Sequence, residues 1–199
     1  MNKCLVLFVE GSTEVEFYKE LIKKIRSSTE SGRIDYKIIY RNVNGIGGFK
    51  KEVNRIFLKE ILPKVSDYHI TVALCYDTDV FGYVQKPKIK WTEVESMLLN
   101  DGASKVLHVK AINSIEDWFL YDIAGICSFL KLKQPITLNG TNGYDKLKNL
   151  FLKTNKIYTK GRVVRGFVQF LNIDLICQNI VDQIKPLYKE LAIGGDSKK

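Results

Sequence analysis

The side chains best suited to chemistry in this sequence are acids that directly follow apolar segments of strand length. Lys3–Val9 is an almost continuous apolar run, typical of a strand buried on both faces, and Glu10 comes next. Ile70–Tyr76 is a second such run, and it leads into Asp77 and Asp79. Sites in parallel sheets lie outside the carboxyl ends of the strands. We therefore expect these acids to converge at one mouth of a sheet.

Two further acids extend this set. Glu14 lies about one helical turn after Glu10, and Glu116 stands near the start of a later helical segment. Clustered carboxylates repel one another unless a cation lies between them, and oxygen-only ligands suit Mg²⁺ or Mn²⁺. Taken singly, each acid is better explained as a helix cap or a surface charge. Taken together, they favour a metal site made of Glu10, Glu14, Asp77, Asp79 and Glu116.

The charge balance points to a polyanionic partner. The net charge is +9, which favours nucleic acid before membrane. Seven basic residues and no acidic residue lie between positions 146 and 172. They are Lys146, Lys148, Lys153, Lys156, Lys160, Arg162 and Arg165. A solvated surface that serves solubility explains such a run equally well, so charge alone does not separate the two interpretations.

Composition excludes several classes of protein. A hydrophobic content of 45% with four prolines excludes intrinsic disorder. The four cysteines are scattered among apolar neighbours with no C-x-x-C pair, so we expect buried thiols without disulfides or zinc. No apolar stretch approaches 18 residues, which predicts a chain without a transmembrane helix and a cytoplasmic location.

The order of apolar patterns predicts an α/β fold, with a mostly parallel sheet, helices on both faces and a helical C-terminal extension. We expect an α/β domain over 1–130, a basic helical extension packed on it over 131–193, and a disordered tail at 194–199. The polar content of the strand at 35–42 favours an edge position. Helices are expected at 49–62, ended by Pro63, and at 115–130, 163–171 and 175–191, the last interrupted or kinked at Pro186.

Two smaller features have a functional and a structural interpretation. The glycines of the loop at 44–48 either let backbone N–H groups approach a phosphate or simply make a tight turn. Tyr83 and Trp91 flank a lysine-rich stretch and could stack on bases, although packing within the loop explains them better.

One combination of motifs resembles a known family. Glu10-Gly11 after a strand, Glu14 in the next helix, and Asp77-Thr78-Asp79-Val80-Phe81-Gly82 after another strand resemble the TOPRIM domain. This domain is the metal-dependent catalytic module of topoisomerases, primases, ribosomal-RNA maturases and OLD-family nucleases. The segments at 43–49 and 115–118 are most similar to the OLD-type and stand-alone bacterial TOPRIM proteins. The resemblance covers roughly residues 3–130.

The resemblance implies roles for particular residues. Glu10 would lie nearest the reacting phosphate as metal ligand or general acid/base, while the other four acids would hold one or two Mg²⁺. OLD-type nucleases also use a downstream lysine, for which Lys160 is the best match, with Lys153 and Lys156 as rivals. The chain has no ATPase half, phosphate-binding G-x-x-x-x-G-K loop or topoisomerase tyrosine domain, so strand passage and primase activity are not expected.

The activity that the resemblance leaves open is Mg²⁺-dependent phosphodiester hydrolysis of DNA or RNA. The resemblance further implies an ATPase partner supplied in trans and a role in antiphage defence or mobile-element biology. Two alternatives stay open. One is a phosphatase that uses Asp77 of the Asp-x-Asp pair as nucleophile, which leaves Glu10-Gly11 unexplained. The other is a non-catalytic TOPRIM-fold module that binds nucleic acid or a partner protein. The oligomeric state is left open.

Overall fold

A computed structural model of the chain describes residues 2–28, 36–79, 89–162 and 164–192. Gly82 of the Asp-x-Asp-x-x-Gly motif, Tyr83 and the tail at 194–199 lie outside the described residues. In the described ranges, no helix is long and apolar enough to cross a membrane. The four cysteines are buried and unpaired, as expected.

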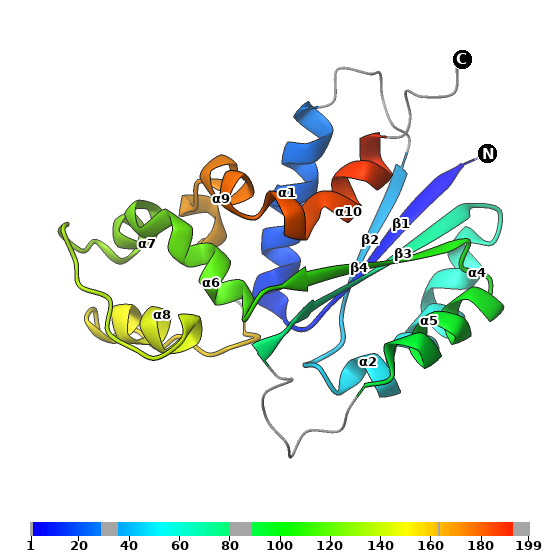
Figure 1. Cartoon of the computed structure of the whole chain (residues 1–199), viewed down its shortest axis with the longest axis horizontal. Coiled ribbons are helices and arrows are strands. Elements are labelled where there is room, and N and C mark those ends of the chain that lie inside the picture. Colours follow the sequence, from blue (N-terminus) through cyan, green and yellow to red (C-terminus); the bar gives the residue numbers. More distant parts are fainter. Residues whose placement is uncertain (1, 29–35, 80–88, 163, 193–199) are drawn as a thin grey trace.

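The centre of the fold is a parallel sheet of four strands (Figure 1). The strands are β1 (Lys3–Val9), β2 (Tyr36–Asn42), β3 (His69–Asp77) and β4 (Lys105–Ala111), in the order β2-β1-β3-β4. The two most apolar strands, β1 and β3, are central, and the more polar β2 is at an edge. The predicted α/β fold with a parallel sheet is therefore confirmed.

Alternate residues of the central strands enter two separate cores, which explains why these strands read as continuous apolar runs. Leu5 and Leu7 of β1 belong to one core, and Val6 and Phe8 to the other. The first core contains α1 (Ser12–Ser28), α6 (Ile115–Phe119), α7 (Ile123–Leu130), α8 (Gly143–Leu152), α9 (Ile173–Asn179) and α10 (Val181–Ala192). The second contains α2 (Gly48–Lys51), α3 (Val53–Ile56), α4 (Leu62–Val65) and α5 (Trp91–Asn100). Helices cover both faces (Figure 1).

The connections between strands create a switch point in the middle of the sheet. From β1 the chain passes through α1, on the first face, to its neighbour β2. From β3 it passes through α5, on the second face, to β4 on the opposite side. Because the two connections diverge, a crevice opens at the carboxyl ends of β1 and β3. Glu10 and Asp77 stand at these two ends.

The expected helix end at Pro63 is wrong. A π-helical turn, η1 (Phe57–Ile61), precedes it, and the N–H of Leu62 pairs with Phe57 O. Pro63 then lies in the first turn of α4, where its missing N–H is tolerated, and the helical path continues to Val65.

Three other expected helices are interrupted, the first of them by a tertiary contact. The segment 115–130 breaks at Asp122, whose carboxylate accepts hydrogen bonds from Gly125 N and Asn172 N. The segment 175–191 breaks at Ile180 and not at Pro186, which lies inside α10. The segment 163–171 holds one 3₁₀ turn, η4 (Val168–Phe170), after Gly166 at φ +77°. That backbone angle is incompatible with a helix.

The buried carboxylate of Glu190 joins α10 to three strands of the sheet. Glu190 accepts hydrogen bonds from Thr71 Oγ1 (2.6 Å), Lys105 Nζ (2.8 Å) and Tyr36 OH (3.1 Å). These donors come from β3, β4 and β2. Burial alone would raise the pKa of Glu190, but the hydrogen bonds from Lys105 and Thr71 outweigh it and lower the pKa. The residues beyond position 131 are thereby tied into the same core as the sheet.

Candidate active site

Glu10 links the carboxyl ends of the two central strands. Its Oε1 accepts a hydrogen bond from the N–H of Asp77 at 2.8 Å, and its own N–H donates to Glu14 Oε2 at 2.9 Å. All three acids are buried, with at most 7% of their surface exposed. The convergence expected from the sequence is therefore present in the structure, and it rests on direct hydrogen bonds.

The loop after β4 brings Glu116 to the same place. Asp77 Oδ1 accepts a hydrogen bond from the N–H of Ile115 at 2.9 Å. The N–H groups of Thr78 and Asp79 donate to Asn113 O at 3.0 and 2.8 Å. These bonds fix the Asp77–Asp79 segment against the start of α6, so that the next residue, Glu116, points into the interior with none of its surface exposed.

Lys160 completes the cluster from a distant part of the chain. Its Nζ lies 2.7 Å from Asp77 Oδ2, 3.3 Å from Asp79 Oδ2 and 3.9 Å from Glu116 Oε2. The lysine-bearing loop packs directly against the β1–α1 turn, because Ser12 N donates to Gly161 O at 2.8 Å. Of the three lysines considered from the sequence, Lys160 is the one that the structure places among the acids.

Tyr158 is a site residue that the sequence did not reveal. Its buried hydroxyl donates to Glu116 Oε1 at 3.0 Å. Burial raises the pKa of Tyr158 well above its usual value, and the charge of Glu116 raises it further, so the hydroxyl keeps its proton. No local motif marks this residue, since its partner lies 42 positions away.

The acids share a perturbed electrostatic environment. Burial raises the pKa of Asp77 to about 8; Glu10 and Glu116 reinforce this rise, and Lys160 opposes it. Burial, and then the charges of Asp77 and Glu10, raise the pKa of Glu14 well above its usual range. Burial would lower the pKa of Lys160, but the carboxylates outweigh it and raise the pKa, so this side chain stays cationic. At neutral pH the raised pKa values favour protonated Asp77 and Glu14 beside a fixed ammonium group.

The donor chemistry fits a divalent cation, although the cluster is not arranged around one. Two buried carboxylate oxygens, Asp79 Oδ1 and Glu116 Oε2, accept no hydrogen bond within the described chain, and Asp77 Oδ2 has only the Lys160 ammonium beside it. Hard oxygen atoms of this kind are the ligands that Mg²⁺ and Mn²⁺ prefer. However, no three acidic, histidine or cysteine side chains of the described residues surround a common metal position. The ammonium of Lys160 lies between the acids instead.

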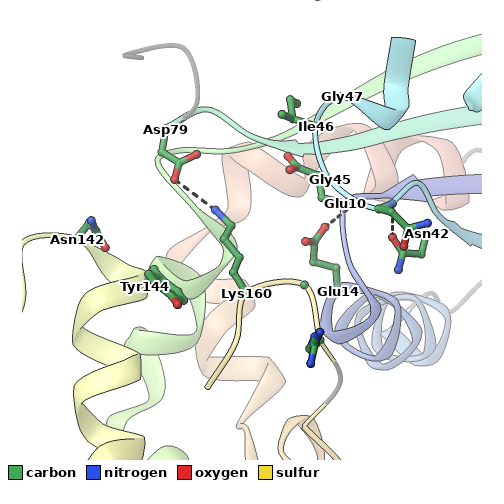
Figure 2. A pocket seen from close by; sticks show the side chains of 13 residues that line it. Glu10, Glu14, Asn42, Gly45, Ile46, Gly47, Asp79, Asn142, Tyr144 and Lys160 are labelled. Carbon is green, nitrogen blue, oxygen red and sulfur yellow. Dashed lines mark hydrogen bonds and ion pairs between the residues drawn. The ribbon is translucent and has the colours of Figure 1, made fainter. Parts of the chain in front are cut away.

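A cleft of about 640 Å³ gives access to the cluster (Figure 2). Its walls come from Glu10 and Glu14, the loop after β2, the start of α8 and the segment 160–162. In Figure 2, Lys160 reaches toward Asp79 while Glu14 points toward Glu10. Asn142 and Tyr144 line the cleft from the start of α8. The cleft is thus shared between the strand ends and the C-terminal third of the chain.

The six other basic residues are mostly on the surface. Lys148, Lys153, Lys156, Arg162 and Arg165 are exposed, and Lys146 is half-buried. Arg162 alone among these six lines the cleft. Lys156 Nζ lies 4.8 Å from the centre of the Phe129 ring, and Lys148 Nζ lies 5.9 Å from that of Tyr144. Of these six residues, the structure therefore places Arg162 in the cleft wall and the other five outside it.

The two smaller sequence features have structural roles. The N–H of Gly45 donates to Glu10 O, and the N–H of Gly48 donates to Gly45 O. Both hydrogen bonds stabilise the turn. A Cβ on Gly48 would collide with the Val43 backbone, which explains the glycine there. Trp91 stacks on Tyr76 with ring centres 3.9 Å apart. Packing within the protein therefore accounts for Gly48 and Trp91, whereas Gly45 and Gly47 also line the cleft.

No protein-family model, curated protein or solved structure matches this chain.

Proposed function

We propose that this protein hydrolyses phosphodiester bonds of nucleic acid with Mg²⁺ or Mn²⁺, as a nuclease of TOPRIM type. The observation that carries the proposal is the group of acids from three separate segments at the switch point of the sheet. Asp79 and Glu116 each have a buried oxygen without a hydrogen-bond donor within the described chain, and Asp77 Oδ2 has only the Lys160 ammonium beside it. Glu10, Glu14 and Asp79 line the cleft next to them. Buried carboxylates are costly unless a cation balances them, so such a group favours a cation-dependent site.

The chain's own residues have distinct tasks in this scheme. Asp77, Asp79 and Glu116 would hold the metal, which supplies Lewis-acid activation of the phosphodiester and of water. Glu10 holds the backbone of Asp77 in place and lines the cleft, where it can accept or donate a proton at the reacting oxygen. Tyr158 fixes the orientation of Glu116 through its hydroxyl.

The two cations of the 160–162 segment face the substrate. Lys160 carries a fixed positive charge beside the acids, suited to stabilising charge that develops on a phosphate. Arg162 lies in the cleft wall and is exposed, so it can contact a neighbouring phosphate of the same strand. Contacts to successive phosphates favour a polymer over a small phosphomonoester.

Cleavage of labelled DNA and RNA with and without Mn²⁺ tests the proposal. Asp77→Asn removes one anionic ligand and should abolish metal-dependent cleavage, since ligand loss weakens metal binding. Asp67→Asn is the matched control, because Asp67 is exposed and lies just before β3, at the other end of that strand. Full cleavage by Asp77→Asn would exclude this site. Release of inorganic phosphate from small monoesters would favour the phosphatase, and binding without cleavage would favour the non-catalytic module.

Salt dependence of binding tests the nucleic-acid part separately. Each phosphate neutralised by the protein releases condensed counterions, so one lost contact flattens the log–log slope by about 1. Arg162→Ala should show this change, whereas Lys64→Ala, at an exposed position of α4, should leave the slope unchanged. A slope of zero in the wild-type protein would argue against a polyanionic substrate.

A further inference from the structure

The ammonium of Lys160 takes the place that a metal ion would need. Its Nζ lies 2.7 Å from Asp77 Oδ2 and 3.9 Å from Glu116 Oε2, and both oxygens are buried without another donor in the described chain. Mg²⁺ binds oxygen at about 2.1 Å, so an ion on Asp77 Oδ2 would lie at most about 4.8 Å from Nζ, the sum of the two distances, where like charges repel strongly in a buried site. The two cations therefore compete for the same oxygens.

We propose that Lys160 and the divalent metal exchange at this position: the ammonium is the resident counter-ion of the metal-free protein, and metal binding displaces it into the cleft. The inference rests on the proposed function, because it assumes that these acids bind metal. It adds a regulatory property to the site. Metal loading has to compete with a built-in cation, and the same event frees the lysine for the substrate.

The backbone around Lys160 determines how the exchange can occur. On its C-terminal side, Gly161 O accepts from Ser12 N at 2.8 Å, and Arg162 O accepts from the hydroxyl of Thr13 at 2.5 Å. Both contacts join the lysine loop to the start of α1. The loop is therefore held in place, and the exchange must be a change of side-chain rotamer. About one third of the Lys160 side chain is already exposed, and the residue lines the cleft. The displaced ammonium thus enters the space where a phosphate would bind.

Competition predicts the size of the effect. When only a fraction of the protein is in the state that can bind a ligand, the apparent affinity for that ligand is lowered to the same fraction of its intrinsic value. If the ammonium occupies the position for nine-tenths of the time or more, removing its charge should strengthen metal binding by about tenfold or more. Lys160→Met keeps most of the side-chain volume and removes the charge. Lys64→Met is the control, since Lys64 is exposed and lies in α4.

Calorimetric titration of Mn²⁺ into the three proteins, without nucleic acid, is the first measurement. Tighter binding by Lys160→Met, with Lys64→Met equal to wild type, supports the exchange. Equal binding by all three proteins overturns the exchange and leaves the nuclease proposal intact. Binding by none of them overturns both.

A second measurement uses the wild-type protein and does not depend on the folding of a variant. The reaction of each lysine with an amine-acylating reagent is followed by mass spectrometry, with and without saturating Mn²⁺. Lys160 should react several times faster when metal is present, because its ammonium has left the acids, while Lys64 should react at the same rate. An unchanged or slower reaction of Lys160 under metal saturation contradicts the exchange.

Discussion

The turn between β1 and α1 packs so closely on the Lys160 loop that position 11 accepts only glycine. A Cβ on Gly11 would lie 2.4 Å from Gly161 Cα, whereas ordinary contacts begin at 3.4 Å. Gly11→Ala must therefore separate the two backbones by about 1 Å, the difference between these distances. The hydrogen bond from Ser12 N to Gly161 O opposes this movement. Overpacking of this kind destabilises a protein by about 1–3 kcal/mol.

In a chain of this size, that loss corresponds to a fall in Tm of about 2–12 °C, measurable by scanning calorimetry in EDTA. Gly47→Ala is the matched control: Gly47 has an ordinary helical φ of −63°, and nothing lies within 4 Å of its Cβ position. It should be neutral or stabilise by up to about 1 kcal/mol. If Gly11→Ala melts at the wild-type temperature, the two segments are not packed as described, and the positioning of Lys160 has to be reconsidered.

Three further predictions concern protonation and buried hydrogen bonds. The folded protein holds a proton on Asp77 that the unfolded chain loses near pH 4, so the free energy of unfolding in EDTA should fall as the pH rises toward about 8. Urea unfolding at several pH values should show a flatter fall for Asp77→Asn. A pH profile of the variant identical to that of the wild type would contradict the raised pKa of Asp77. Glu190→Ala leaves three donors unpaired and should lower the free energy of unfolding by about 2–4 kcal/mol. The control Glu93→Ala, at an exposed position, should lower it by less than about 0.5 kcal/mol. Similar losses in the two variants would show that Glu190 does not hold α10 on the sheet. Tyr158→Phe removes the donor to a buried carboxylate and should destabilise by about 1–3 kcal/mol, whereas Tyr121→Phe, at an exposed position, should be silent in the same denaturant titration.

Helix boundaries show where sequence patterns were insufficient. The apolar spacing over 115–130 and 175–191 is helical, and most of these residues are indeed helical. The breaks at Asp122 and Ile180 were not predicted, because the spacing of apolar residues continues across them. Asp122 leaves the helix to bind Asn172 N, 50 residues away. A contact over that distance has no local signature, so periodicity cannot locate the interruption.

The sequence by itself determined the sheet and the place of the acids. Strands buried on both faces need continuous apolar runs, so β1 and β3 could be recognised as interior strands, and the acids that follow them were expected at one mouth of the sheet. The strand order that makes β1 and β3 neighbours came from the structure. The tertiary structure alone decided which lysine joins them and that Tyr158 supports Glu116. These choices depend on how the chain after α8 returns across the β1–α1 turn. That return is fixed by the approach of Gly161 to Gly11, a backbone contact between residues 150 positions apart, and nothing in the local sequence of either segment specifies its partner.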